Sequence, residues 1–207
     1  MLTRDEQATN AATWEHIHRV RHFLNICQLS LMVRGEEHDQ SKLKPPEVAV
    51  FTECTERLKD LTYGSDEYKA CLKEMKPALD HHYAHNSHHP EFYQHWECPT
   101  CRKLFWPGSV PKIDYPDSDF RWCDDCHSGR YPGFFETALI HRPASVKHMD
   151  LLDVLEMLCD WKAATERHAD GDILKSIDIN VERFGLSEQL ADILRNTVAY
   201  FEEVTSD

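Results

Sequence analysis

The sequence lacks any long apolar run. Its longest apolar stretch, residues 26–33, is interrupted by Gln28 and Ser30, whereas a membrane span needs at least about 18 apolar residues. The N-terminal residues are polar and contain no apolar segment of the kind that a secretory signal requires. We therefore expect no membrane partner and a cytoplasmic location.

Basic charge is also scarce. The 207 residues include 23 Lys and Arg against 36 Asp and Glu, for a formal net charge of -13 at pH 7. Extended nucleic-acid binding depends on basic side chains that contact phosphates, so this balance argues against a nucleic-acid partner. It does not exclude a small phosphorylated substrate, because several of the acids are candidate metal ligands.

Strand patterns are rare, and helical periodicity covers most of the chain. We predict helices over about residues 14–33, from Pro45-Pro46-Glu47 through Leu58, from Ser65 or Asp66 through Leu79, over residues 151–161, from Gly171-Asp172 to Phe184, and over residues 187–201. Residues 34–37 should end the first helix, and Pro77 should bend or restart the third. The predicted fold class is all-α. Residues 1–95 and 144–207 would form one discontinuous helical domain, with an inserted module at 96–143.

Half of the cysteines lie in that insertion. Cys98-Pro-Thr-Cys101 and Cys123-Asp-Asp-Cys126 are two Cys-x-x-Cys units with residues 102–122 between them. In a reducing cytoplasm such pairs are typical of metal sites, and four thiolates can close a tetrahedral zinc site. We predict a structural zinc ion here, because a four-cysteine site leaves no open position for catalysis. Reduced structural cysteines are the alternative.

Histidine and carboxylate groups come from four separate segments. They are His16, the pair His38-Asp39, the cluster His81, His82, Asn86, His88 and His89, and finally Asp153, Glu156 and Asp160. Imidazole and carboxylate together suit a divalent transition metal such as Mn, Fe, Co, Ni or Zn. His18 is an alternative to His16. We interpret Asp153 and Glu156 as capping or supporting groups.

Three of these segments resemble the HD-domain metal-dependent phosphohydrolase superfamily. The resemblance rests on His16-x-x-Arg19-Val20, on His38-Asp39 and on Asp160 in Cys159-Asp160-Trp161-Lys162. His38-Asp-Gln-Ser-Lys42 is also similar to the His-Asp-x-Gly-Lys form of the cyclic-dinucleotide phosphodiesterase branch. Over about residues 14–95 and 147–200, the chain more closely resembles an uncharacterised family common in tailed phages and bacteria. The cysteine insertion departs from that family's compact form.

The resemblance implies a role for each segment. The metal ligands would be His16, His38, Asp39 and Asp160, with His81 and His82 as ligands of a second metal. His88 and His89 would bind phosphate or serve as an acid, and Asp39 and Lys42 would take part in catalysis. Lys42, Asn86 and Lys162 would bind the substrate.

Together these roles imply an HD-like metal-dependent phosphohydrolase acting on a nucleotide or another small phosphate ester, in a bacterial or phage-infected host cytoplasm. A divalent ion can activate water, while cations stabilise charge that develops on the phosphate. Two other classes stay open. One is a non-catalytic adaptor whose metals only hold the fold, and the other is a di-iron oxygenase of the HD type. A homo-oligomeric state also stays open.

Overall fold

The computed structural model describes residues 2–59, 61, 65–106, 123, 126, 139–167 and 171–205. The chain divides into two compact units, residues 1–40 and residues 41–207. Among the described residues, helices dominate and the only sheet has three short strands. The predicted all-α fold class is therefore confirmed. No described helix is both long enough and apolar enough to cross a membrane.

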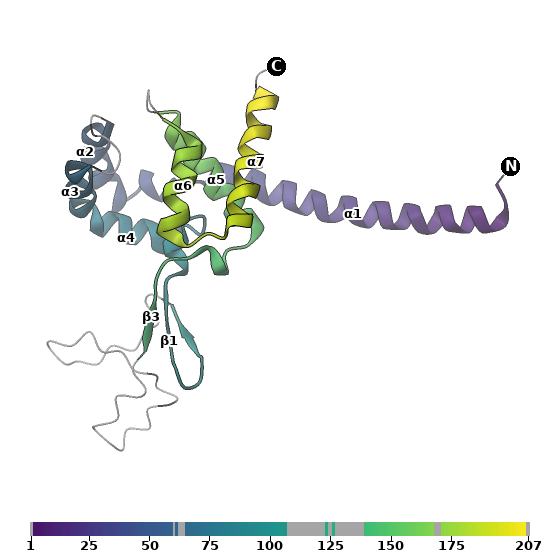
Figure 1. Ribbon diagram of the computed structural model, residues 1–207, viewed down its shortest axis with the longest axis horizontal. Coiled ribbons are helices and arrows are strands. Elements are labelled where there is room, and N and C mark those ends of the chain that lie inside the picture. The colour runs from purple at the N-terminus through teal and green to yellow at the C-terminus, as the bar shows by residue number, and fades with distance from the viewer. Residues whose placement is uncertain are drawn as a thin grey trace. The chain divides into compact units, whose positions relative to one another are not determined.

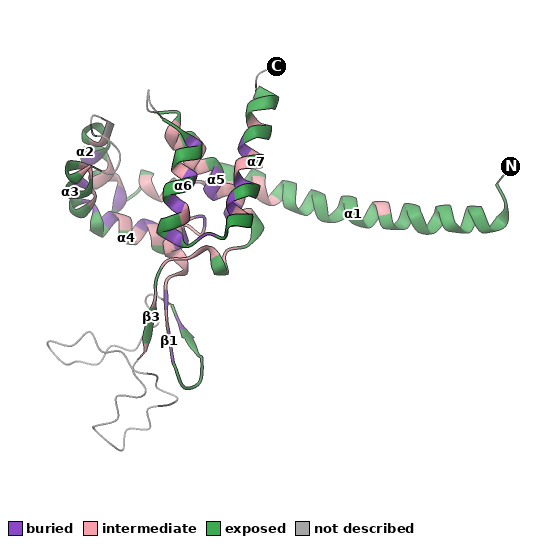
Figure 2. Cartoon of the chain, viewed as in Figure 1, coloured by how far each residue is buried: buried purple, intermediate pink, exposed green. Residues whose placement is uncertain are grey.

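The first unit consists mainly of one long helix, α1 (Arg4–Glu37). Thr3 begins it with a capping box, in which the Thr3 and Glu6 side chains each accept a hydrogen bond from the other's backbone N–H. The helix ends at Glu37, within the predicted stretch 34–37, but it runs through Gly35 and begins at Arg4 instead of near residue 14. Glycine inside a helix costs only about 1 kcal/mol relative to alanine, which does not by itself end a long helix. No residue of α1 is buried (Figure 2).

The second unit contains two groups of helices (Figure 1). The first group is α2 (Glu47–Lys59), α3 (Asp66–Glu74) and α4 (Lys76–His85), and the second is α5 (Leu151–Thr165), α6 (Ile173–Phe184) and α7 (Glu188–Thr205). Each group packs around its own cluster of buried apolar side chains. The sequence predicted five helices here, because α3 and α4 were expected as one helix that Pro77 bends or restarts. The helices begin close to the predicted positions, while α4 and α5 end later than predicted, at His85 and Thr165.

Cys54, Cys71 and Met75 form the buried centre of the α2–α4 group. Ser65 is the N-cap of α3, and its side chain accepts a hydrogen bond from the N–H of Tyr68. Pro77 lies in the first turn of α4, so it restarts the helix as predicted. This restart directs α4 toward the histidine cluster at its C-terminal end.

The α5–α7 group has the larger core. Leu158 and Ile177 are fully buried, and α6 ends at Gly185, whose φ of 65° lies in the left-handed region that favours glycine. Asp150 is the N-cap of α5, and the buried Asp153 completes its capping box by accepting a hydrogen bond from the N–H of Asp150. Asp153 also accepts hydrogen bonds from Ser87 and Tyr93. These two contacts attach the segment after α4 to α5.

A small antiparallel sheet occupies both ends of the predicted insertion. Its strands are β1 (His95–Glu97), β2 (Leu104–Phe105) and β3 (Ile140–Arg142), in the order β2-β1-β3. Trp96 pairs with Phe105 on one side and with His141 on the other. The Glu97 carboxylate accepts hydrogen bonds from Arg142 and lies 2.7 Å from Arg102. The sheet thus brings the start and the end of the cysteine module together.

Candidate metal centres

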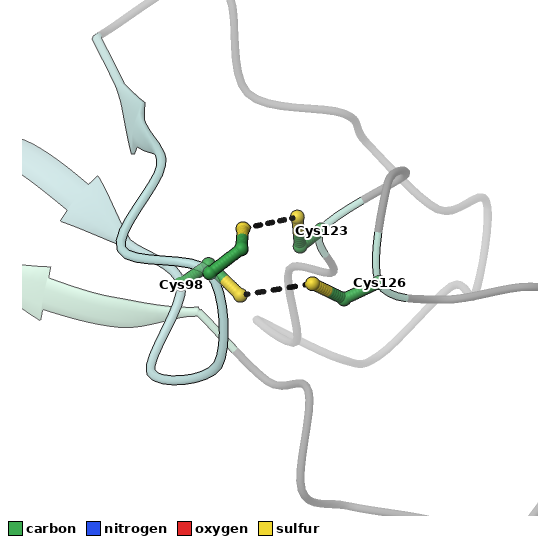
Figure 3. A group of neighbouring side chains, drawn as sticks. Cys98, Cys123 and Cys126 are labelled. Carbon is green, nitrogen blue, oxygen red and sulfur yellow. Dashed lines mark hydrogen bonds between the residues drawn. The ribbon is translucent and has the colours of Figure 1, made fainter.

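The four cysteines of the two Cys-x-x-Cys units converge. Their sulfur atoms lie within 4.8 Å of one another, with 3.8 Å between Cys98 and Cys126 and 3.6 Å between Cys101 and Cys123. Figure 3 shows the side chains of Cys98, Cys123 and Cys126 turned toward one another. In a tetrahedral site with Zn–S bonds of about 2.3 Å, the sulfurs lie about 3.8 Å apart. The four free thiols therefore have the spacing of a metal-ligand set.

Two of the four thiols have shifted pKa values, in opposite directions. Burial opposes ionisation of Cys98, but the N–H groups of Cys101 and Thr100 outweigh it and lower the pKa of Cys98 to about 7. The hydrogen bond to Cys101, and then burial, raise the pKa of Cys126 to about 12. One thiolate is therefore readily formed, while further ones are repelled by it. The positive charge of a bound divalent ion would offset the repulsion between the thiolates, so all four thiols could lose their protons.

A second cluster contains three imidazoles from the end of α4 and the segment after it. One ring nitrogen from each of His82, His88 and His89 lies within 4.8 Å of the others. The Nε2 atoms of His82 and His89 are 2.9 Å apart, close to the roughly 3.0 Å between neighbouring ligands on an octahedral ion with bonds of about 2.1 Å. Without an ion, one ring must donate a hydrogen bond to the other. The three nitrogens are thus suitably spaced for one metal ion.

Glu47, the first residue of α2, orients His82. Its side chain is 0% exposed, and its two oxygens lie 2.6 Å from His81 Nδ1 and 3.0 Å from His82 Nδ1. Ser41 also donates a hydrogen bond to Glu47, at 2.9 Å. Because an ionised carboxylate only accepts hydrogen bonds, the proton of His82 belongs on Nδ1 and its lone pair on Nε2. The hydrogen bonds from His81 and Ser41 outweigh burial and lower the pKa of Glu47, so the carboxylate is ionised.

This arrangement is not a serine-hydrolase triad. In a triad, the histidine uses one ring nitrogen for the acid and the other for the serine. Here Ser41 and Glu47 both face Nδ1 of His82, with the Ser41 hydroxyl 2.9 Å away. Ser41 therefore supports the orientation of His82 rather than acting as a nucleophile.

His88 has a carboxylate partner of its own. Its Nδ1 lies 3.0 Å from Oε1 of Glu156, and both side chains are largely buried. The geometry again favours a proton on Nδ1 and a lone pair on Nε2. Glu156 thus supports a candidate ligand, as its sequence position suggested, and Asp153 is part of the capping box of α5.

Charged neighbours surround His89. Burial, followed by the electrostatic influence of the neighbouring His88 and His82, lowers the pKa of His89 to about 3. Asp160 acts in the opposite direction, and Lys42 lowers the pKa further. His89 is therefore a neutral imidazole at neutral pH, which is the form that binds a metal. Asp160 and Lys42 both belong to the electrostatic environment of the cluster.

Three other predicted residues of this unit have different contacts. His81 hydrogen-bonds to Glu47 and stacks on the ring of His85, with 4.1 Å between ring centroids, rather than joining the three-imidazole cluster. Asn86 uses its side-chain amide to donate to Ser41 and to the carbonyl of His82. Lys162 pairs with Glu166 at 2.7 Å. The structure thus gives Asn86 a supporting role and does not bring His81 into the ligand set.

The remaining predicted ligands, His16, His38 and Asp39, belong to the first unit. His38 ends α1, and its Nε2 lies 3.5 Å from Oδ2 of Asp39, so the pair could bind one ion. Along the uninterrupted α1, His16 is about 33 Å from His38 at 1.5 Å per residue. The structure therefore does not bring His16, or the alternative His18, to the His38-Asp39 pair. The participation of this pair in a centre with Asp160 stays a prediction.

Two supporting residues were missed by sequence reasoning. Glu47 looked like an ordinary acid in the first turn of a helix, and Ser41 looked like a motif residue without a role. Their partners lie 34 to 45 positions later in the chain. The available signal was an acid at the start of a helix that follows the His-Asp pair, but only tertiary packing identifies its partners.

The pKa of His89 leads to a testable pH dependence of stability. Its pKa is lowered from 6.5 to about 3 in the folded protein, so between these values the unfolded chain binds more protons. The free energy of unfolding of the metal-free protein should therefore fall as the pH is lowered through this window. Urea unfolding at several pH values measures the slope, which should be smaller in His89→Asn. An equal slope in that variant, with His85→Asn as the control, would contradict the assignment.

The fold and the two ligand clusters define a mostly helical protein with two candidate metal centres. The chain belongs to the "Family of unknown function (DUF5662)", whose model matches residues 5–108 and 127–200. The residues between these two segments include Cys123 and Cys126. Comparisons with curated proteins and with solved structures find no significant match.

Proposed function

We propose that this protein is a metal-dependent phosphohydrolase that acts on a nucleotide or another small phosphate ester. The observation that carries the proposal is the cluster of His82, His88 and His89, two of which have a carboxylate partner at Nδ1. Such carboxylate partners are typical of metal-binding histidines. The resemblance of His38-Asp39 and Asp160 to the HD superfamily supports the same reaction class.

The residues around the cluster have the charges that this reaction needs. A divalent ion held by the three imidazoles would lower the pKa of water and so provide a nucleophile near neutral pH. Lys42 is a cation close enough to His89 to affect its pKa, and it could bind an anionic phosphate. Asp160 is the nearby carboxylate that could bind the ion or accept a proton. Glu47 and Glu156 contact the Nδ1 atoms of His82 and His88 and so orient the two rings.

The cysteine cluster would have a separate role. A four-cysteine set provides all the ligands of a structural zinc ion, and we assign zinc to Cys98, Cys101, Cys123 and Cys126. This closed set also favours the second candidate function, an adaptor whose metals only stabilise the fold. The two functions differ in whether the histidine centre turns over a substrate.

Hydrolysis assays test the proposal. The purified protein, supplied in turn with Mn, Co, Ni or Fe, should hydrolyse at least one member of a panel of nucleotides and phosphate esters. His82→Ala should reduce the activity to background, whereas His22→Ala, at an exposed position of α1, should retain it. Asp39→Ala tests the predicted contribution of the His38-Asp39 pair. Absence of turnover with every metal would reject the phosphohydrolase and favour the adaptor.

A further inference from the structure

Two carboxylates, one buried and one largely buried, contact histidines of the cluster at Nδ1. Glu47 comes from the start of α2, and Glu156 comes from the middle of α5. Each lies 3.0 Å from the Nδ1 atom of a different histidine, His82 or His88. Both histidines are buried, at 1% and 3% side-chain exposure, so solvent does not compete for these contacts.

We infer that Glu47 and Glu156 are positioning residues that set the affinity of the histidine centre for its metal, by holding His82 and His88 in the tautomer that carries the proton on Nδ1. The inference rests on the proposed metal centre. A neutral imidazole has one donor and one acceptor nitrogen, and a carboxylate at Nδ1 determines which is which. Each Nε2 atom then carries a lone pair before any ion is bound, and in the metal-free protein that of His82 accepts a hydrogen bond from His89.

The network around Glu47 strengthens this inference. The hydroxyl of Ser41 donates to Glu47, and the amide of Asn86 donates to Ser41 and to the carbonyl of His82. These contacts fix the carboxylate and the backbone of His82 relative to each other. Rotation of the His82 ring would therefore break several hydrogen bonds in a buried site, where unsatisfied polar groups are costly.

The test measures metal binding and tautomer instead of activity. Mn²⁺ is the probe because it prefers nitrogen and oxygen ligands and leaves the thiolate site to zinc. Titration of the zinc-loaded protein, followed by electron paramagnetic resonance, should show affinity reduced about 10- to 100-fold in Glu47→Gln and in Glu156→Gln. Glu53→Gln, an exposed position on α2, is the matched control and should bind as the wild type does.

Nitrogen NMR of the metal-free protein provides a second readout, and its measurement on the wild type does not depend on the folding of any variant. We expect His82 and His88 to be protonated on Nδ1, and we expect Glu47→Gln to change the tautomer of His82 while leaving that of His88 as it was. Protonation of both rings on Nε2 would overturn the inference. Equal Mn²⁺ affinity in the wild type and both variants would overturn the positioning role of Glu47 and Glu156 but not the proposed metal centre. A wild type that binds no Mn²⁺ would overturn both.

Discussion

Cys98→Ser is expected to remove one zinc ion per chain and to unfold the small sheet of the cysteine module. Serine is a poor replacement for a thiolate ligand, and Cys98 is fully buried in a cluster whose other buried members are Phe105 and Cys123. Such a small apolar cluster contributes little stability by itself. Zinc binding in comparable small modules provides about 10–16 kcal/mol. Metal content and the NMR signals of β1 and β3 measure the loss.

The control for this experiment is Cys27→Ser, since Cys27 is an exposed residue of α1. It should retain both the zinc and the signals of the sheet. The circular dichroism of Cys98→Ser should keep most of its helical signal, because the cores of α2–α4 and α5–α7 do not include the module. A full equivalent of zinc in Cys98→Ser would show that the four cysteines are not its ligands.

Asp153→Ala should lower the free energy of unfolding by about 3–5 kcal/mol. The buried carboxylate accepts hydrogen bonds from Ser87 at 2.6 Å, from Tyr93 at 2.5 Å and from the N–H of Asp150 at 3.1 Å. Alanine would leave these donors without their acceptor and would remove the capping box of α5. Urea unfolding followed by circular dichroism measures the change.

Glu182→Ala is a suitable comparison, because Glu182 is exposed on α6 and its replacement should change stability by no more than about 0.5 kcal/mol. Tyr93→Phe in the Asp153→Ala background should cost less than Tyr93→Phe in the wild type, since the hydroxyl has already lost its acceptor. A loss below about 1 kcal/mol for Asp153→Ala would mean that water replaces the missing contacts.

Local patterns predicted most of the helices. The restart at Pro77, the N-cap at Ser65 and the C-terminal Gly185 each depend on a few neighbouring residues, and the structure contains all three. The helix α1 ends within the predicted stretch 34–37, but its last turn was not predicted to be helical, because Gly35 resembles a helix breaker. A single glycine inside a helix costs only about 1 kcal/mol relative to alanine. The same continuous helix separates His16 from His38.

The candidate site was predictable in its ligand types and not in its internal organisation. The sequence identified the two Cys-x-x-Cys units as a ligand set and His82 as a ligand of a second metal. His88 and His89 were expected to bind phosphate or to serve as an acid, whereas the structure places them beside His82 with the spacing of metal ligands. It could not assign Glu47 to His82 or Glu156 to His88, because these pairs join helices far apart in the chain. Such contacts depend on tertiary packing, whereas helical periodicity predicts only where each helix lies in the sequence.

Anomalous diffraction from crystals grown with zinc and excess Mn²⁺ tests the central claim most directly. The account predicts a zinc signal among Cys98, Cys101, Cys123 and Cys126. It also predicts a separate manganese signal within bonding distance of the Nε2 atoms of His82, His88 and His89. A zinc signal at the cysteines, with no metal at the three imidazoles, would contradict the account.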